Sequence, residues 1–277
     1  MHIQRGAWAE INLDAVAHNV QMAKANLKPT TKLCAVVKAD AYGHGAVRVA
    51  QEAARNGADF FAVALLQEGV KLREAGIETP ILVLGSMLPE VAEICVRYDI
   101  SHAVFDEERL YALNAAALKL HTKAKIHIKI DTGMHRIGVH VRDAGRFAKL
   151  AASLPGIYIE GVFSHFATAD ADDKQYAAYQ FERFQEALRL IEAEGVHIPI
   201  RHIANSAALT ELQEYQLDMV RQGITLYGLH PAHMIDCYKD FEPVMTVKTQ
   251  VAFVKTLPPG ETIGYGRTYT LTRPSVI

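Results

Sequence analysis

The sequence predicts an α/β protein: a TIM (β/α)8 barrel followed by the start of a mainly β C-terminal domain. Short apolar or β-branched runs alternate with longer amphipathic helical patterns along most of the 277 residues, which is typical of parallel β/α units. The alternation provides eight strand candidates over about the usual length of a barrel. A doubly wound open sheet is the alternative, because a sequence pattern does not show whether a sheet closes.

Eight strands are expected between residues 33 and 221, with helices between them. The strands are 33–38, 60–65, 81–85, 103–105, 126–131, 158–164, 201–204 and 217–221. The helical patterns include 44–56, 67–75, 89–98, 107–118, 142–153, 174–194 and 206–213. Gly57, Gly76 and Gly195 stand where a helix C-terminus favours a residue with positive φ.

The pattern changes after residue 231, where β-branched runs replace the alternation. Residues 244–256 form a long strand pattern, Pro258–Gly260 a turn, and residue 268 begins another strand. We assign 1–13 to an N-terminal strand that joins this β region, 14–231 to the barrel and 232–277 to an incomplete β domain. By the pattern the chain ends in mid-strand, and a strand pair without a sheet is marginally stable.

Composition excludes several classes of function. The net charge is −2, so there is no basic excess to favour nucleic acid. No apolar run reaches the length of a membrane span, and the N-terminus lacks the apolar core of a signal peptide. The cysteines, Cys34, Cys95 and Cys237, are far apart and without a CxxC pair. We expect buried thiols in a cytoplasmic protein, and no metal site, because the histidines show no zinc spacing.

The segment 35–45, AVVKADAYGHG, carries the strongest chemical signal. Lys38 ends an apolar strand and a Gly-rich turn follows. A desolvated amine at a pocket mouth is what Schiff-base chemistry requires, and the turn offers backbone N–H groups and the Tyr42 hydroxyl to an anion. The alternative is a surface lysine whose stem lies along apolar neighbours.

Other polar residues follow later strands of the expected barrel. Catalytic groups of TIM barrels gather at the C-terminal ends of the strands, so these side chains should converge. Polar residues are common at strand ends in any case, but a lysine, two arginines and a histidine around one mouth favour a site. The residues are Lys38, Arg136, His165, Asn205, Ser206 and Arg221.

Four segments together resemble the alanine racemases. They are 35–45, IKIDTGMHRIG at 128–138, RQGITLYG at 221–228 and GYG at 264–266. The resemblance runs along the whole chain and implies that the chain is truncated within its C-terminal β domain. It also implies pyridoxal 5′-phosphate (PLP) held as an imine on Lys38. It implies a phosphate cradle made by Tyr42, Ser206, Gly223 and Ile224, beside Asn205. A plain helix N-cap is the alternative role for Ser206.

The resemblance also assigns the groups around the cofactor ring. Arg221 would face the pyridine nitrogen, where a guanidinium donates without handing over its proton and thereby suppresses transamination. Arg136 would contact the phenolic oxygen or the substrate carboxylate. Lys129 matches a position that is carbamylated in some relatives, although an ordinary buried lysine paired with Asp131 is an equal alternative. His165 would link Arg221 to a catalytic tyrosine.

Tyr265 is that tyrosine by resemblance, although its place between two glycines is also typical of a hairpin turn. Racemisation removes a proton from one face of Cα and returns it on the other. Lys38 would serve the D-face and Tyr265 the L-face, each as base in one direction and acid in the other. Tyr265 would reach the barrel mouth of a second subunit, which implies a homodimer with shared sites.

These observations predict a cytoplasmic, PLP-dependent alanine racemase that supplies D-alanine for peptidoglycan. The alternative within the same fold is a racemase of broader specificity, or one for serine or lysine. A decarboxylase with a related barrel would call for an acidic partner at the pyridine nitrogen in place of Arg221. An alternative of another class is a non-catalytic PLP-binding barrel, against which the β region with Tyr265 argues.

Overall fold

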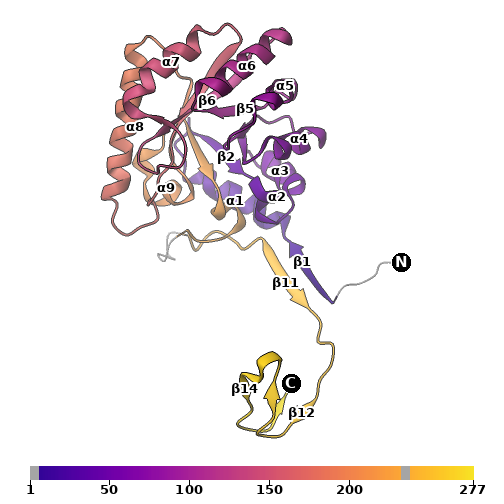
Figure 1. Cartoon of the computed structure of the whole chain (residues 1–277). Helices are drawn as coiled ribbons and strands as arrows, with labels where there is room; N and C mark the ends of the chain where they lie inside the picture. Colours follow the sequence, from indigo (N-terminus) through magenta and orange to yellow (C-terminus); the bar gives the residue numbers. More distant parts are fainter. Residues whose placement is uncertain (1–5, 232–237) are drawn as a thin grey trace. The chain divides into compact units, whose positions relative to one another are not determined.

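The computed structural model describes residues 6–231 and 238–277. It divides into two compact units, one of Asn12–Val244 and one that joins Met1–Ile11 to Met245–Ile277. The larger unit holds a parallel sheet with the strand order β10-β2-β3-β4-β5-β6-β8-β9 (Figure 1). The strands are β2 Lys32–Val36, β3 Phe60–Val63, β4 Ile81–Val83, β5 Ser101–Val104, β6 Ala124–Asp131, β8 Ile157–Phe163, β9 Ile200–His202 and β10 Met219–Gln222; a short β7, Val139–His140, pairs with β6.

The two ends of this sheet meet, which makes a nearly closed barrel. Residue Asp218 donates its backbone N–H to the Arg201 carbonyl at 3.0 Å, and Arg221 donates to Ala204 at 3.1 Å. These two bonds join β9 to β10 along the seam. The predicted TIM barrel is therefore confirmed, and the alternative of an open doubly wound sheet is wrong.

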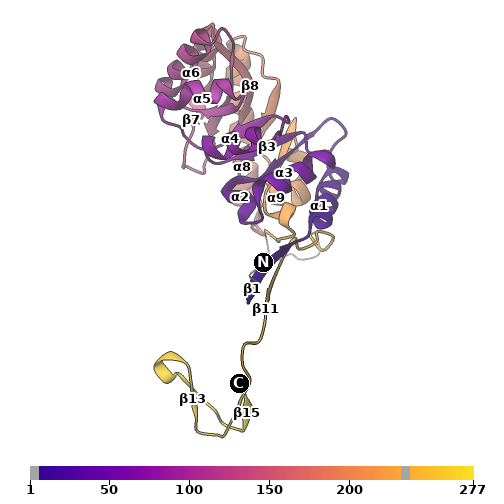
Figure 2. The same ribbon diagram turned by 90° about the vertical axis from the view of Figure 1, so that its right-hand side faces the viewer.

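Helices cover the outside of the barrel (Figure 2). Their bounds are α1 Leu13–Ala25, α3 Ala46–Arg55, α4 Leu66–Glu74, α5 Ala92–Arg97, α6 Glu107–Lys119, α7 Ala144–Ser153, α8 Gln175–Ala193 and α9 Ser206–Glu211. Gly57, Gly76 and Gly195 have φ of 98°, 82° and 76°, as the sequence predicted for helix ends. Helix α1, which was not among the helices named from sequence, begins because the Asn12 side chain accepts from the N–H groups of Asp14 and Ala15.

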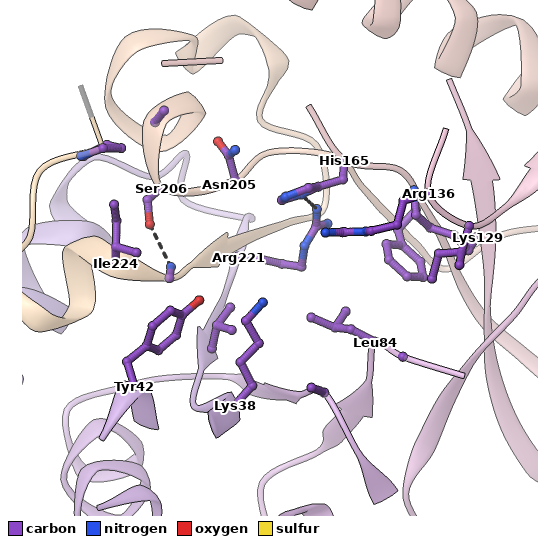
Figure 3. Close-up of a pocket in the computed structure, with 18 of the residues that line it drawn as sticks. Lys38, Tyr42, Leu84, Lys129, Arg136, His165, Asn205, Ser206, Arg221 and Ile224 are labelled. Atoms are coloured by element: carbon purple, nitrogen blue, oxygen red, sulfur yellow. Dashed lines mark hydrogen bonds between the residues drawn. The ribbon is translucent and has the colours of Figure 1, made fainter. Parts of the chain in front are cut away.

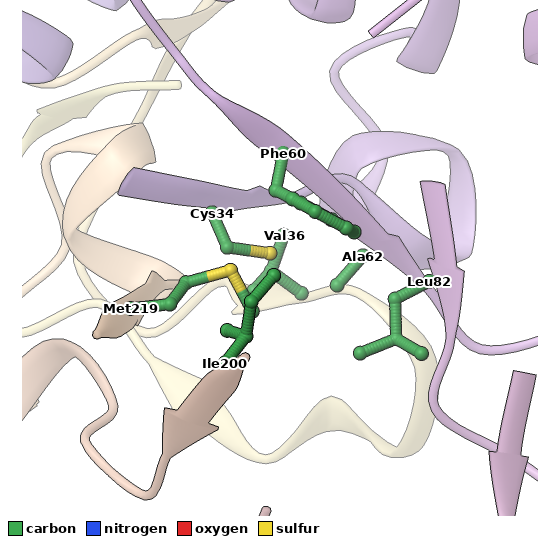
Figure 4. Packing of buried hydrophobic residues seen from close by; sticks show 7 residues of the cluster. All are labelled: Cys34, Val36, Phe60, Ala62, Leu82, Ile200 and Met219. Carbon is green, nitrogen blue, oxygen red and sulfur yellow. The ribbon is translucent and has the colours of Figure 1, made fainter. Parts of the chain in front are cut away.

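The barrel interior is filled from several strands at once (Figure 4). The cluster consists of Cys34, Val36, Phe60, Ala62, Leu82, Ile200 and Met219, all buried. Full burial of a Val, Leu, Ile, Phe or Met side chain stabilises the fold by roughly 1.5–3 kcal/mol. Burial also raises the pKa of Cys34 to about 12, so its thiol is inert. Cys95 is likewise a buried free thiol, whereas Cys237 lies outside the described residues.

The smaller unit consists of strand pairs. Strand β1, Ala7–Ile11, pairs antiparallel with β11, Met245–Thr249. Two further antiparallel pairs are β12 Thr256–Leu257 with β15 Ser275–Val276, and β13 Thr262–Ile263 with β14 Tyr269–Thr270. The long strand expected over 244–256 stops at Thr249, because that residue pairs with the first residue of β1 and the pairing ends there.

Candidate active site

Lys38 stands at the start of an unusual turn. Strand β2 ends at Val36 rather than at Lys38 as expected, and the next helical element, α2 Lys38–Tyr42, is left-handed in part. Ala39, Asp40, Ala41 and Tyr42 have φ between 51° and 55°. Left-handed backbone costs an L-residue roughly 1–2 kcal/mol. The chain therefore leaves the barrel through a strained turn, beginning directly after the lysine, in residues that are not glycine.

Two carboxylates hold this turn. Glu68 accepts the N–H of Ala39 at 2.6 Å through one oxygen, and those of Ala64 and Leu65 at 2.8 and 3.0 Å through the other. Asp40 accepts the N–H of Ala46 at 3.0 Å, where α3 begins. Hydrogen bonds from N–H groups to carboxylates are among the stronger ones in proteins. They tie the loop after β2 to the loop after β3 and so fix the direction of Lys38.

A cavity of about 560 Å³ opens at the C-terminal ends of the strands (Figure 3). All the site residues predicted for the barrel line it, and the picture shows Lys38 and Tyr42 pointing from one segment into the space below Arg221 and Ser206. Tyr265 begins the short turn η6, Tyr265–Arg267, in the smaller unit, where its side chain is fully exposed. The barrel residues are Lys38, Tyr42, Lys129, Arg136, His165, Asn205, Ser206, Arg221, Gly223 and Ile224.

Three residues of the predicted phosphate cradle, Ser206, Gly223 and Tyr42, lie together on one side of the cavity. The hydroxyl of Ser206 accepts the Gly223 N–H at 2.8 Å and the Thr225 hydroxyl at 3.2 Å. A Cβ on Gly223 would lie 3.6 Å from both the Ser206 and the Tyr42 hydroxyl oxygens, so any side chain would fill the space between them. The alternative role of Ser206 as helix cap is wrong, because Asn205 caps α9 by accepting from Ala208 at 3.0 Å.

Arg221 anchors the floor of the cavity. Its guanidinium donates to His202 Nδ1 at 2.6 Å, to His165 Nδ1 at 3.0 Å, and to the carbonyls of Ser164 and Ile203. A guanidinium only donates, so both imidazoles accept at Nδ1 and the neutral His165 ring carries its proton on Nε2. Burial lowers the pKa of Arg221 to about 10, so it stays protonated at neutral pH.

The surroundings of Lys38 and His165 lower the pKa of both groups. Burial and the charges of Arg136 and Arg221 lower the pKa of Lys38, although Glu68 acts in the opposite sense. Burial, with Arg221, holds the pKa of His165 well below its usual range. A lowered pKa suits the Lys38 amine to proton transfer, whereas Nδ1 of the His165 ring already accepts from Arg221.

Lys129 is the most deeply buried amine of the site. Burial and Arg221 lower its pKa to about 7, and its Nζ donates to the Ile130 carbonyl at 3.0 Å. The carboxylate of Asp131 binds His135 Nδ1 at 2.9 Å and the backbone N–H groups of Gly133 and His135. Among the residues that the structure describes, Lys129 has no ion pair, so the alternative of a pair with Asp131 is wrong.

Sequence reasoning missed several residues at the site. Leu84, Gly85, Ser86, Phe163 and Asp170 also line the cavity. Leu84, Gly85 and Phe163 were taken as strand residues only, although their places at the C-terminal ends of strands would have indicated the site. Within 6–231 and 238–277, no group of three or more His, Cys, Asp or Glu side chains is suited to a metal ion, and no helix is long and apolar enough to span a bilayer.

Comparison with known proteins identifies the family. The sequence model of the alanine racemase N-terminal domain matches residues 11–231, and that of the C-terminal domain matches 244–277. The chain belongs to the alanine racemase family. An alanine racemase of Desulfovibrio desulfuricans is 46% identical over 265 residues, which are 96% of this chain and 71% of that protein. That of Halothermothrix orenii is 45% identical over 99% of this chain and 73% of its own length.

Solved structures agree with this assignment. The alanine racemase of Clostridium difficile 630 superimposes with a TM-score of 0.92 at 38% identity, over 99% of this chain and 72% of that one. The structure of the Bacillus anthracis alanine racemase with bound L-Ala-P gives 0.91 at 35%, over all of this chain and 72% of that one. These relatives are isomerases that act on amino acids, and the chain falls in that enzyme class.

Proposed function

We propose that this chain interconverts L-alanine and D-alanine, with PLP bound covalently to Lys38. One observation carries the proposal: an amine of lowered pKa lies between the Ser206–Gly223–Tyr42 cradle and a protonated arginine, in one cavity. The names of the relatives supply the substrate. We extend the proposal to the cytoplasm as the place of the reaction and to peptidoglycan precursors as the use of D-alanine.

The residues present fit PLP. A phosphate needs a concave set of donors, and Gly223 leaves room for one between two hydroxyls. The described residues that line the cavity include Lys38, Lys129, Arg136 and Arg221 against one carboxylate, Asp170, so the cavity favours an anionic ligand. Bound PLP supplies an electron sink that makes the Cα–H bond of an amino acid more acidic.

The chain's own residues would move the proton. With PLP bound, the Lys38 amine would take or return a proton at Nζ on the D-face of Cα, as its lowered pKa favours. The Tyr265 hydroxyl does the same on the L-face. The proton on His165 Nε2 is available to stabilise a phenolate of that tyrosine, and Arg136 would bind the substrate carboxylate.

Arg221 would limit side reactions. It is protonated, and among the described residues it donates to four acceptors, none of them a carboxylate. A pyridine nitrogen facing it would receive a hydrogen bond but no proton. Negative charge would then remain nearer Cα, which favours prompt reprotonation there over transamination.

We further propose a homodimer in which Tyr265 serves the barrel of a second copy. The Tyr265 side chain is fully exposed in its own unit. The proposed site at the barrel needs a base on the L-face of Cα, and Tyr265 of a second copy would supply it. A closed two-fold dimer with two equivalent sites is the simplest assembly of this kind.

The decisive assay measures D-alanine formed from L-alanine by the protein that carries this chain. L-serine and L-lysine in parallel reactions test the broader-specificity alternative. Borohydride reduction followed by peptide mapping should leave the pyridoxyl group on Lys38, and Lys38→Ala should be inactive and unlabelled. A label on Lys32 or Lys129 would contradict the assignment, and labelled but inactive protein would favour the non-catalytic PLP-binding barrel.

A further inference from the structure

A chain of buried polar side chains runs from Arg221 into the barrel interior. His202 lies 2.6 Å from Arg221 through Nδ1, and its Nε2 lies 2.9 Å from His127 Nδ1. The far nitrogen of His127, Nε2, is 3.0 Å from a Glu160 carboxylate oxygen, which also accepts the Ser101 hydroxyl. Both imidazoles are fully buried, and neither of them lines the cavity described above.

The arginine sets the direction of every bond in this chain. Because a guanidinium has no acceptor, His202 Nδ1 must accept and His202 Nε2 must carry the proton. Then His127 Nδ1 accepts from His202, and His127 Nε2 carries the proton given to Glu160. A second proton on His127 would face the proton of His202, so both rings are neutral. The donors therefore point one way, from a cation to an anion.

The fold makes room for this chain at two adjacent residues. Strand β8 shifts register against β6 so that Glu160 is the extra residue between Ile159 and Gly161, and such bulges re-aim side chains. A Cβ on Gly161 would lie 2.5 Å from His127 Nδ1 and 2.6 Å from the Ile200 carbonyl, so only glycine admits the imidazole there.

The second ring is also held in place. Phe163 stacks on His202 with a centroid distance of 4.9 Å and an angle of 4° between the planes. Burial and Arg221 hold the pKa of His202 well below its usual range, in agreement with a neutral ring. The imidazole is therefore fixed both in orientation and in charge.

We infer that Glu160 is the remote counter-ion of Arg221, coupled to it through neutral His127 and His202, and that it positions the guanidinium for the reaction. The inference rests on the proposed function for its kinetic part only. Within the part of the chain that the structure describes, Arg221 donates to no carboxylate directly. A negative charge at the end of a one-way donor chain makes each acceptor more basic, so His202 Nδ1 holds the arginine more firmly than an isolated imidazole would.

Glu160 itself is suited to this role. Burial raises the pKa of Glu160, whereas hydrogen bonds from His127 and Ser101 and the charge of Lys125 act in the opposite sense. These are the groups that face it from β5 and β6. Because both hydrogen bonds are donated to the carboxylate, they favour its ionised form.

The test combines a spectrum with kinetics in Glu160→Gln, which keeps an oxygen acceptor but removes the charge. Proton–nitrogen NMR of histidine-labelled protein, recorded without substrate, should show His127 and His202 as neutral Nε2–H tautomers. In Glu160→Gln the His127 Hε2 resonance should move upfield, because the bond to an uncharged oxygen is weaker. The kcat for alanine should fall about tenfold with little change in KM, since Arg221 acts on the reaction rather than on substrate capture.

Asp218→Asn is the matched control, because Asp218 also accepts several donors from an arginine, Arg201, but outside the chain. It should leave both the histidine signals and kcat unchanged. An Nδ1–H tautomer on either ring would overturn the proposal in the wild-type spectrum alone, even if the variant did not fold. An unmoved Hε2 signal, or an unchanged kcat in Glu160→Gln, would also overturn it. If the wild-type protein does not racemise alanine, the proposed function fails while the NMR result still decides the counter-ion.

Discussion

Replacing Glu68 with glutamine should loosen the strained turn that carries Lys38. The two carboxylate oxygens of Glu68 receive three backbone N–H groups, from Ala39, Ala64 and Leu65. An amide offers only one oxygen, so its NH2 group must face either Ala39 or the other two donors. At least one of these three N–H groups then loses its acceptor.

The expected cost is about 2 kcal/mol, because a hydrogen bond to a charged group contributes roughly 1.5–3 kcal/mol. The turn is sensitive to the loss of this hydrogen bond, because its backbone is already strained. Four successive residues from Ala39 to Tyr42 have positive φ, at roughly 1–2 kcal/mol each. For a unit of this size, a loss of about 2 kcal/mol corresponds to a fall in melting temperature of about 4–8 °C.

Differential scanning calorimetry of Glu68→Gln measures this shift, with Glu107→Gln as the control. Glu107 forms one exposed ion pair with Arg146 at 3.0 Å, so its loss should change stability by less than about 0.5 kcal/mol. The amide of Ala39 should also exchange hydrogen faster in Glu68→Gln. Equal melting temperatures in the two variants, with unchanged exchange at Ala39, would refute the idea that Glu68 holds the turn.

Three further predictions concern the reaction. Arg221→Glu should lower the rate of racemisation and raise side transamination, measured as pyruvate formed per D-alanine; an unchanged ratio would show that the arginine is only structural. Because the pKa of Lys129 is lowered to about 7, its neutral, nucleophilic fraction rises between pH 6 and 8. Labelled bicarbonate should therefore give a carbamate carbon signal that grows over this range and is absent from Lys129→Met; no signal at pH 8 would exclude the modification under these conditions. Lys38→Ala and Tyr265→Phe should each be nearly inactive, and mixing them should restore activity in heterodimers, where one site has both lesions and the other has neither. Heterodimers that form, as differently tagged subunits would show, but stay inactive would contradict a shared site.

The barrel could be predicted from sequence because its strands are continuous apolar runs. Because apolar residues are continuous along these strands, the sequence pattern did not indicate which strand residues face inward. His127 and Lys129 alternate with Ile126 and Ile128 along β6, and all four are buried, so no polar face stood out. The bulge that turns Glu160 inward depends on pairing between β6 and β8, which a single strand does not encode.

The turn after Lys38 could not be foreseen for a different reason. The glycines Gly43 and Gly45 predicted a turn, but the left-handed residues are mostly those before them. Local preference opposes that conformation in alanine and tyrosine. It is imposed by tertiary contacts such as that of Glu68, a residue 29 positions away from Ala39, and distant contacts leave no periodic trace in the sequence.

Arg221 also helps to close the barrel at the seam between β9 and β10. Its backbone N–H closes the barrel at Ala204, while its side chain grips the carbonyls of Ile203 and Ser164 from the strand ends on the other side of that seam. The guanidinium therefore holds neighbouring strand ends together, in addition to the role proposed for it in the reaction. Substituting Arg221 would therefore weaken the closure of the barrel and change the proposed reaction at the same time. Arg221→Lys keeps the charge but loses the planar set of donors, so it would separate the two roles. A variant that still binds PLP but has a lower free energy of unfolding would show the structural role by itself.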